Sequence, residues 1–320
     1  MKLVVLDGYT LNPGDLSWDA LKDLADVTIH DRIKSDEASI RDAIGDADAV
    51  ITNKIPLQKA MLTQLPNLKY IGVTATGYNI IDVDAAKEQG VTVTNVPAYS
   101  TASVAQFTMA LVLELCHHVG DHNAAVQSGQ WENSKDFCFW NSPLIELEGK
   151  TMGIIGFGQI GKAAAALAQA FGLNVLVYNR TVYPEYETET CRFVSLDELL
   201  QASDFVSLHC PMTPDTAGII NAETLSKMKS SAFLINTSRG GLVKEADLAE
   251  ALESEKIAGA AVDVVSEEPI VSENPLLGAK NCIITPHIAW APLEARRRCL
   301  QIAVNNVETY INGEAQNVVS

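Results

Sequence analysis

Short runs of apolar, mostly β-branched residues alternate with helical patterns along most of the chain. Five such runs fall in its first part, at residues 3–6, 27–29, 49–51, 70–73 and 91–94. A second series of six follows, at residues 153–155, 175–178, 205–208, 232–235, 258–262 and 282–284. Regular alternation of strands and helices is typical of parallel sheets covered by helices. The pattern therefore predicts an α/β protein with two doubly wound domains.

Three segments lie outside these two series. A helix that is apolar nearly all round is predicted at residues 102–117, opened by a capping box of Ser103 and Gln106. Residues 121–149 follow as a long irregular insertion, of a length that usually serves a function or an interface. The last helical pattern, residues 293–311, has no sheet of its own, so we expect it to return to the first lobe. The predicted domains are residues 1–98 plus 293–320, and residues 99–292.

Charge narrows the range of partners. The 320 residues carry a formal net charge of -17, and the pI is about 4.7. Such an acidic chain repels phosphate backbones and anionic lipid, so we expect neither nucleic acid nor a membrane as a partner. A small anionic ligand would then need a local cluster of positive charge.

Cysteine spacing and the start of the chain bear on metal binding and location. The six cysteines show neither the CxxC spacing of a zinc site nor a disulfide framework. We therefore expect no bound metal, and reduced thiols in a cytoplasmic protein. The chain opens on a strand pattern rather than a signal peptide, and its longest uncharged stretch contains proline, asparagine and many hydroxyls. A membrane span is not expected.

The segment GIIGFGQIG carries the first strong chemical signal, with Gly156, Gly158 and Gly161 directly after an apolar run. In a dinucleotide fingerprint the first glycine permits a tight turn, the second lets backbone amides approach a pyrophosphate, and the third lets helix and strand pack closely. The helix N-terminus adds partial positive charge. A plain glycine turn is the alternative, but a predicted strand at Thr151–Ile155 and a helix former at Lys162–Phe171 favour nucleotide binding.

Three further groups stand just past predicted strand ends: Arg239 in NTSRGG, Glu268 in DVVSEEP and His287 in TPHIAW. Each alone has an ordinary explanation, as a solvated surface charge, a loop carboxylate before a proline, or a histidine satisfied by its neighbours. Ligands of open parallel sheets bind at the carboxyl ends of the strands. The joint placement of the three groups therefore predicts one shared site.

These motifs make the chain resemble the D-isomer-specific 2-hydroxyacid dehydrogenases over essentially its whole length. The family's GxGxxG matches Gly156–Gly161, its NxxRG arginine matches Arg239, its DVxxxEP glutamate matches Glu268, its TPH histidine matches His287, and its LHxPxT segment matches Leu208–Thr213. The segments NPGDLSW, TNKIPL and VTATGYNIID are most similar to glycerate dehydrogenases, also called hydroxypyruvate reductases. The resemblance implies a Rossmann cofactor domain inserted into a flavodoxin-like substrate domain.

It also implies hydride transfer between NAD(P)H and a small 2-keto acid, such as hydroxypyruvate or glyoxylate. His287 is the expected proton donor, and Glu268 should favour its cationic form and orient the ring. Arg239 can offer two parallel donors to the carboxylate and carbonyl of the substrate. In the first lobe, the family pattern assigns the backbone amides of Thr76 and Gly77 to the same carboxylate, and a plain turn is the competing explanation.

The resemblance further predicts a set of cofactor contacts. Asp263 matches the family position that faces the nicotinamide carboxamide, with a capping aspartate as the alternative. Thr108 is expected to reach the pyrophosphate, and Lys54 either faces the substrate or stands exposed. The predicted cofactor-binding residues are Thr108, Gly156, Phe157, Gly158, Gln159, Ile160, Gly161, Asn179, Arg180, Thr181, His209, Cys210, Pro211, Thr216, Thr237, Ser238, Arg239, Asp263 and His287.

The end of the second strand departs from an NAD-preferring fingerprint. An Asp or Glu at that point normally takes the adenosine ribose hydroxyls and repels a 2′-phosphate. This chain has Asn179 followed by Arg180 and Thr181. We therefore expect NADPH to be used at least as well as NADH, and the alternative is that Arg180 points to solvent and NAD binds regardless.

Aromatic residues crowd the insertion, where Trp131, Phe137, Phe139 and Trp140 fall close together, and Trp290 follows the TPH motif. Such clusters are enriched at interfaces. We expect the insertion to contribute to a homodimer interface, and Trp140 or Trp290 to narrow the substrate pocket. Core packing of the insertion is the alternative.

Two other functions are weighed against this one. A dinucleotide-sensing binding protein on the same fold, like the transcriptional corepressors related to this family, can keep Arg239, Glu268 and His287. The acidic charge and the lack of long disordered tails disfavour it. A formate-oxidising branch carries glutamine in place of the glutamate, so Glu268 argues against that activity.

Overall fold

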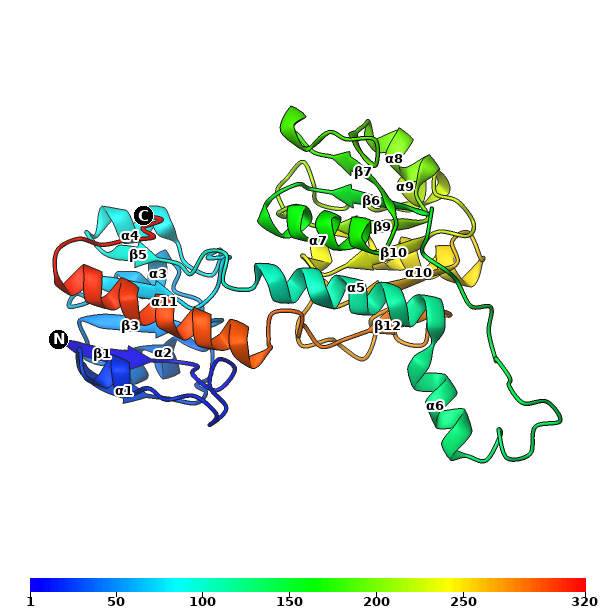
Figure 1. The fold of residues 1–320 in the computed structure, drawn as a ribbon. Helices are drawn as coiled ribbons and strands as arrows, with labels where there is room; N and C mark the ends of the chain where they lie inside the picture. Colours follow the sequence, from blue (N-terminus) through cyan, green and yellow to red (C-terminus); the bar gives the residue numbers. More distant parts are fainter. The chain divides into compact units, whose positions relative to one another are not determined.

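The computed structural model describes residues 1–320, which form two compact units. The first unit comprises Met1–Ser100 with Ala291–Ser320, and the second comprises Thr101–Trp290. Each unit contains one parallel sheet with helices packed on it (Figure 1). The prediction of two doubly wound parallel-sheet domains is confirmed.

The sheet of the first unit has the strand order β2-β1-β3-β4-β5. Its central strands are buried along their whole length, which is why they read as unbroken apolar runs rather than as alternating patterns. The strands are β1 (Lys2–Val5), β2 (Asp26–Ile29), β3 (Ala49–Thr52), β4 (Tyr70–Val73) and β5 (Thr92–Thr94). The helices are α1 (Asp19–Lys22), α2 (Glu37–Ile44), α3 (Lys59–Leu62), α4 (Val83–Glu88) and α11 (Leu293–Ile311).

Helix α11 belongs to the first unit although it follows the last strand of the second in sequence. It packs against β4, where the rings of Tyr70 and Tyr310 lie 4.6 Å apart. Beyond the helix, the chain end runs back along β5, with Val318 bridged antiparallel to Thr94. The C-terminal segment therefore adds both a helix and an edge to this sheet.

The sheet of the second unit has the order β12-β11-β10-β9-β6-β7-β8. The chain moves outward from β6 to β8 and then crosses back to β9 on the other side of β6, so the strand order reverses between β6 and β9. Open α/β sheets bind ligands at such a switch point, outside the carboxyl ends of the strands. The strands are β6 (Thr151–Ile155), β7 (Asn174–Tyr178), β8 (Cys191–Phe193), β9 (Phe205–Leu208), β10 (Phe233–Asn236), β11 (Gly259–Val262) and β12 (Cys282–Ile284).

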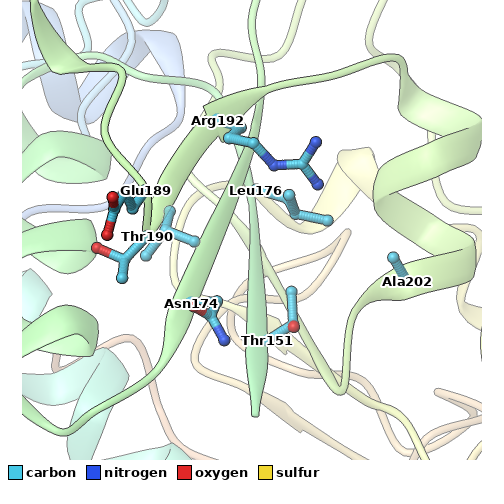
Figure 2. A pocket seen from close by; sticks show the side chains of 8 residues that line it. Thr151, Asn174, Leu176, Glu189, Thr190, Arg192 and Ala202 are labelled. Carbon is cyan, nitrogen blue, oxygen red and sulfur yellow. The ribbon is translucent and has the colours of Figure 1, made fainter. Parts of the chain in front are cut away.

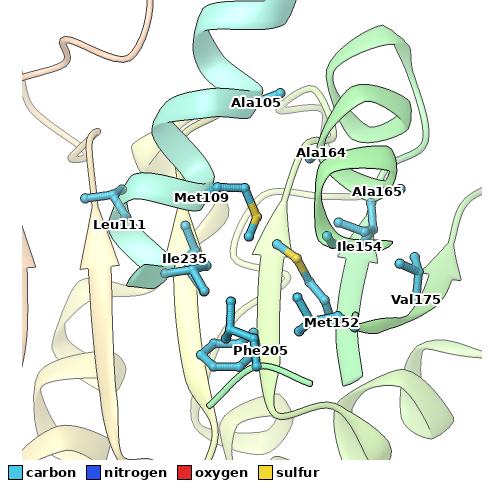
Figure 3. Packing of buried hydrophobic residues seen from close by; sticks show 14 of the residues in the cluster. Ala105, Met109, Leu111, Met152, Ile154, Ala164, Ala165, Val175, Phe205 and Ile235 are labelled. Carbon is cyan, nitrogen blue, oxygen red and sulfur yellow. The ribbon is translucent and has the colours of Figure 1, made fainter. Parts of the chain in front are cut away.

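Helices cover both faces of this sheet. On one face α5 and α7 lie side by side, and Figure 3 shows Met109 of α5 directed toward Met152 of β6 within the buried apolar cluster. On the other face Leu199 of α8 packs so closely that Gly153 of β6 has no room for a Cβ atom. The helices are α5 (Thr101–His117), α6 (Val119–Gln127), α7 (Gln159–Ala170), α8 (Leu196–Ala202), α9 (Ala222–Ser226) and α10 (Glu245–Glu253).

The structure corrects two local predictions. The segment expected to be wholly irregular begins with helix α6, which extends away from the sheet and has no buried residue (Figure 1). The long apolar helix begins at Thr101, so Ser103 lies inside its first turn and is not the capping residue. No single helix is long and apolar enough to cross a membrane. Helices α5 and α6 taken together would be, by length and composition only, but the pair is bent by 54°.

Candidate nucleotide and acid–base site

The glycine turn after β6 has the geometry of a dinucleotide fingerprint. Gly156 has a φ of 96°, and a Cβ atom there would lie 2.5 Å from the backbone nitrogen of Cys210. A Cβ at Gly161 would collide with the carbonyl oxygen of Gly156, so α7 can pack on the turn only with glycine there. At Gly158 a Cβ would meet nothing within 4 Å. Two glycines thus serve close packing, and the middle one faces open space.

Helix α7 begins at this open position with uncapped amides. Gly158 is its N-cap residue, with no side chain bonded to the first turn, and Gln159 is exposed. No acidic residue stands in that turn. Free backbone N–H groups and the helix dipole together favour an anion such as a pyrophosphate. Gly158, Gln159 and Ile160 therefore fit the phosphate part of a dinucleotide.

At the end of β7, Asn179 closes the fingerprint turn from the side. Its Oδ1 accepts a hydrogen bond of 3.0 Å from the amide of Phe157, and its Nδ2 donates to the carbonyl of Thr181 at 2.7 Å. The amide of Phe157 is thus engaged and its ring is buried, and its contact with the cofactor stays a prediction. Arg180 is exposed, with no ion pair or hydrogen bond of its own. It is a free cation beside the turn.

An aromatic cage holds the loop that follows Arg180. The ammonium group of Lys162 on α7 lies 4.4 Å from the ring centroid of Tyr186 and 4.5 Å from that of Tyr183. The ring of Phe157 packs edge-on against Tyr186 at 5.3 Å. Such cation–π contacts stabilise the folded loop. Sequence reasoning missed this role of Lys162, because the contact joins residues more than twenty positions apart with no local pattern.

The loop after β9 faces the fingerprint turn. Burial lowers the pKa of His209 to about 4, so its ring is neutral near pH 7, and it lies 2.9 Å from the hydroxyl of Ser207. Thr216 closes the loop by donating to the carbonyl of Pro211 at 2.7 Å. Cys210 is buried with its backbone against Gly156. These residues form one wall of the turn, and the wall carries no charge.

The loop after β10 presents Arg239. Asn236 shapes it by accepting from the amide of Ser238 at 3.0 Å and donating to the carbonyl of Arg239 at 2.9 Å. A Cβ atom at Gly240 would collide with the backbone of Val265, so this loop lies directly against the loop after β11. The guanidinium of Arg239 is exposed and spends one donor on the carbonyl of Ser238. Its remaining donors are available to a ligand.

Thr108 joins α5 to the loop after β10. It is fully buried on α5, and its hydroxyl donates to the carbonyl of Val104 at 2.9 Å and lies 3.1 Å from the hydroxyl of Thr237. Those contacts tie α5 to the end of β10. The contact of Thr108 with the pyrophosphate stays a prediction.

Asp263 has a structural role in the loop that carries His287. Its Oδ1 accepts from the hydroxyl of Thr285 at 2.7 Å and from the amide of Ile288 at 2.9 Å, and its Oδ2 accepts from the amide of Ala289 at 2.9 Å. Its side chain is buried. Asp263 thus accepts three hydrogen bonds from the loop after β12, and its place facing the nicotinamide stays a prediction. The capping alternative describes what is seen.

This aspartate holds His287 in an uncommon conformation. His287 has a φ of 55°, in the left-handed region that costs free energy for a side chain larger than glycine. Its Nδ1 lies 2.7 Å from Oε2 of Glu268. The side chain of His287 is 29% exposed and that of Glu268 is 31% exposed. The other carboxylate oxygen accepts from the amide of Val265 at 3.3 Å. The contact orients the imidazole and leaves Nε2 open.

The first unit has a second set of free backbone donors. The amides of Thr76 and Gly77, just past the carboxyl end of β4, donate to no group of the protein. Successive free amides at a turn can bind an anion. Nearby, the carboxylate of Asp7 accepts from the amides of Asn53 and Lys54 at 2.8 and 2.6 Å. The side chain of Lys54 is exposed, as one of its two alternatives predicts. Sequence reasoning missed Asp7, although its place in the segment DGY, just past the end of β1, could have pointed to it.

Two cavities lie elsewhere on the second unit. The smaller, of about 260 Å³, is lined by Thr151, Asn174 and Arg192 among others (Figure 2). The larger, of about 580 Å³, includes Phe233 and Cys282. Thr151, Asn174, Phe233 and Cys282 are the first residues of their strands, so both cavities lie at the amino ends. The candidate site lies at the opposite edge of the sheet, past the carboxyl ends of the strands, where the fingerprint, Arg239 and His287 are found.

Comparisons with known proteins agree with this geometry. A family model described as D-isomer specific 2-hydroxyacid dehydrogenase, NAD binding domain, matches residues 109–289. A hydroxypyruvate reductase of Blautia hydrogenotrophica is 54% identical over 321 residues, all of both chains. A glycerate dehydrogenase of Methylorubrum extorquens is 43% identical over 275 residues, 85% of each chain. The solved structure of an acyclic imino acid reductase in complex with NADPH and D-Arg has a TM-score of 0.86 at 29% identity, with both chains fully covered.

Fold and site together define a dehydrogenase with a nicotinamide dinucleotide domain. Over its full length the chain belongs to the D-isomer specific 2-hydroxyacid dehydrogenase family. It is an NAD(P)-dependent oxidoreductase acting on small 2-keto or 2-hydroxy acids, and the predictions of family, fold and enzyme type are confirmed.

Proposed function

We propose that this enzyme reduces hydroxypyruvate to D-glycerate, with glyoxylate as a smaller second substrate. The names of the two relatives above, hydroxypyruvate reductase and glycerate dehydrogenase, support this substrate class. The observation that carries the proposal is the 2.7 Å contact between His287 and Glu268 on the strand edge that also bears Arg239. An acid next to a free guanidinium suits a 2-keto acid, which needs both a proton and a counter-charge.

In this proposal His287 protonates the carbonyl oxygen from Nε2. Glu268 holds Nδ1 at 2.7 Å and so orients the ring, which leaves Nε2 free to donate the proton. Arg239 binds the substrate carboxylate and polarises the carbonyl with its remaining donors. When bound, the dihydronicotinamide supplies the hydride. Asp263 acts behind the site, by holding the loop of His287 in place.

We assign the second unit as the cofactor domain and the first as the substrate domain. The fingerprint turn and the uncapped start of α7 suit the pyrophosphate of a dinucleotide. The free amides of Thr76 and Gly77 suit the carboxylate of the substrate.

For the cofactor, we propose that NADPH is used at least as well as NADH. Asn179 spends its side chain on the turn, and no carboxylate stands at the end of β7 to repel a 2′-phosphate. Arg180 is a free cation at that point. Replacing it (Arg180→Ala) should lower kcat/KM for NADPH by about tenfold, equal to about 1.4 kcal/mol, and leave NADH within twofold.

The matched control for that experiment is Arg192→Ala, which removes another exposed arginine from the amino side of the same domain. It should change neither value. A strong NADH preference in the wild type that Arg180→Ala leaves untouched would reject the cofactor proposal while the reductase activity stands.

We propose a cytoplasmic location for the enzyme. Its six cysteines are free thiols, which suits a reducing compartment.

We also propose a homodimer built through the arm, defined as residues 119–146. Trp140 of the arm is 65% exposed and Phe137 is 89% exposed, so the alternative of core packing for these two rings does not hold. We further propose that Trp140 or Trp290 narrows the substrate pocket.

The direct test is a panel of 2-keto acids followed at the nicotinamide absorbance. Hydroxypyruvate, glyoxylate, pyruvate and oxaloacetate are each assayed with NADPH and with NADH. We expect the highest kcat/KM for hydroxypyruvate and a lower value for glyoxylate. No turnover with any of the four would overturn the proposed activity, and a preference for pyruvate or oxaloacetate would overturn the substrate.

A further inference from the structure

Three asparagines from distant parts of the first unit form a connected chain behind the Thr76–Gly77 loop. Asn95 follows β5, Asn306 lies on α11 and Asn317 stands in the C-terminal tail. Asn306 donates to the carbonyl of Asn95 at 2.9 Å, and its Oδ1 accepts from Nδ2 of Asn317 at 2.8 Å. The amide of Asn95 donates to the carbonyl of Asn317 at 3.1 Å. The three residues thus close a ring of hydrogen bonds.

This ring ends on the loop that carries the free amides. The side chain of Asn95 donates to the carbonyl of Thr76 at 2.8 Å, and the hydroxyl of Thr76 donates to the carbonyl of Val96 at 3.0 Å. The amide of Val96 donates to the carbonyl of Ala75 at 3.0 Å. The carbonyls of Ala75 and Thr76 are therefore bonded within the unit, and the amides of Thr76 and Gly77 have no hydrogen-bond partner in the protein.

Burial shows that the arrangement is more than a surface contact. Asn306 is 2% exposed and Asn95 is 9% exposed. A buried amide costs free energy unless it is paired, and asparagine is a poor residue for the middle of a helix. An apolar residue at position 306 would suit both the helix and the core better. The polar side chain is accounted for by the bonds it makes to Asn95 and Asn317.

We infer that Asn306, through Asn95 and Asn317, is a positioning residue for the substrate carboxylate. It does not touch the substrate itself. It fixes the peptide groups of Thr76 and Gly77 so that their N–H groups point at one anion, a task in which small displacements are costly. This inference rests on the proposed function, because it takes the carboxylate of a 2-keto acid as the ligand of the two amides.

The test compares Asn306→Leu with Asn305→Ala. Asn305 is the next residue on the same helix and is exposed, so its variant controls for a change in α11 itself. We expect Asn306→Leu to raise KM for hydroxypyruvate by about tenfold and to leave KM for NADPH within twofold. Asn305→Ala should leave both values unchanged. A purely structural role would lower the active fraction, and hence kcat, without moving one KM alone.

Asn317→Gly is the second variant, in case Asn306→Leu does not fold. Asn317 has a φ of 54°, which glycine adopts freely, so the change removes the amide and spares the backbone conformation. The same rise in KM for hydroxypyruvate is expected, smaller than for position 306. Unchanged KM in every folded variant, or an equal change for both substrates, would overturn the inference.

Calorimetric binding of oxalate separates this inference from the proposed activity. Oxalate offers a carboxylate without needing turnover, and its Kd is measured with NADPH present. If the wild type binds oxalate but reduces no 2-keto acid, the activity fails, and a tenfold weaker Kd in the variants still supports the inference. Wild type that binds no oxalate, or variants that bind it equally well, would overturn the positioning role.

Discussion

At the scale of single residues, two carboxylates with different tasks hold His287, the proposed acid. Asp263 accepts two amides and a hydroxyl from the loop after β12 and so holds His287 at a φ of 55°. Glu268 then contacts the imidazole directly at 2.7 Å. One carboxylate shapes the backbone, and the other orients the imidazole ring.

This division predicts different kinetics for two substitutions. His287→Ala removes the proton donor and should lower kcat by about 100-fold or more. Glu268→Gln keeps a polar side chain but loses the carboxylate that holds Nδ1 of the imidazole, so kcat should fall, by less than in His287→Ala. Steady-state kinetics with hydroxypyruvate at a fixed pH measure both.

Glu267→Gln serves as the control, because Glu267 is the neighbouring carboxylate and is exposed without a partner. It should leave kcat unchanged. Near-normal turnover of His287→Ala would remove the histidine from the acid role, and an unchanged kcat in Glu268→Gln would reject the orienting role of Glu268.

At the scale of elements, the buried strands were the predictable part. Strands β4 and β9 begin and end where the apolar runs predict, because a strand covered on both faces is mostly apolar. The half-buried edge strand β12 also has the predicted bounds. Helix α11 likewise has the predicted bounds. Strand β8 was missed, since its three residues lie at the sheet edge and include an exposed arginine.

Side-chain partners could not be predicted in the same way. Thr108 and Thr237 meet across more than a hundred residues, and Asp263 spends its oxygens on a loop over twenty residues away. Helix α6 escaped prediction because it has no buried face, so its sequence shows no amphipathic period. Motifs located the site, but only the packed structure separates supporting residues from those facing a ligand.

The glycine turn allows a prediction about the whole β6–α7 element. Gly158→Ala places a methyl group in open space at a φ of -74°, so the melting temperature should not fall. The same methyl would occupy the approach to the uncapped amides. KM for NADPH should rise by about tenfold, equal to about 1.4 kcal/mol, while KM for hydroxypyruvate stays within twofold.

Gly161→Ala is the contrasting variant, because its methyl would collide with the backbone of Gly156. It should lower the melting temperature or prevent folding, since neither backbone can yield cheaply. A Gly158→Ala protein with normal KM for NADPH would show that the pyrophosphate does not bind over this turn.

At the scale of the whole molecule, helix α11 bonds to both chain segments that leave the first unit. The chain crosses at Ser100–Thr101 and at Trp290–Ala291. Within the first unit, Arg298 donates to the carbonyl of Tyr99 at 2.9 Å, and Arg296 donates to that of Ala291 at 2.9 Å. Helix α11 therefore anchors the two segments where they leave the first unit.

Arg296 also binds Asp15, and this pair predicts how stability depends on pH. Its guanidinium donates to both oxygens of Asp15, at 2.7 and 2.6 Å, and this hydrogen bonding lowers the pKa of Asp15 below 3.8. A lowered pKa contributes stability that is present above the unfolded value and lost as the pH falls through the folded value. Asp15→Asn should therefore melt below the wild type at pH 7, and the gap should close below about pH 3.5.

Melting curves between pH 7 and about pH 3 test this, with Asp23→Asn as the control. Asp23 is an exposed aspartate in the same unit without an ion pair, so its variant should show no comparable change with pH. A gap between Asp15→Asn and wild type that stays constant over the range would contradict the linkage.

The arm makes the last prediction, which concerns assembly. None of the nine residues of α6 is buried, and Phe137, Trp140 and Leu144 are more than half exposed. Exposed aromatic clusters of this kind mark protein interfaces, because leaving them in water is unfavourable. Light scattering at micromolar concentration should give twice the chain mass of 34.5 kDa. The double variant Phe137→Ser with Trp140→Ser should shift the protein to the monomer mass, whereas Leu277→Ser, another exposed apolar side chain of the same unit, should not. A wild-type monomer would refute the dimer without touching the chemistry of His287, since that residue and Glu268 belong to one chain.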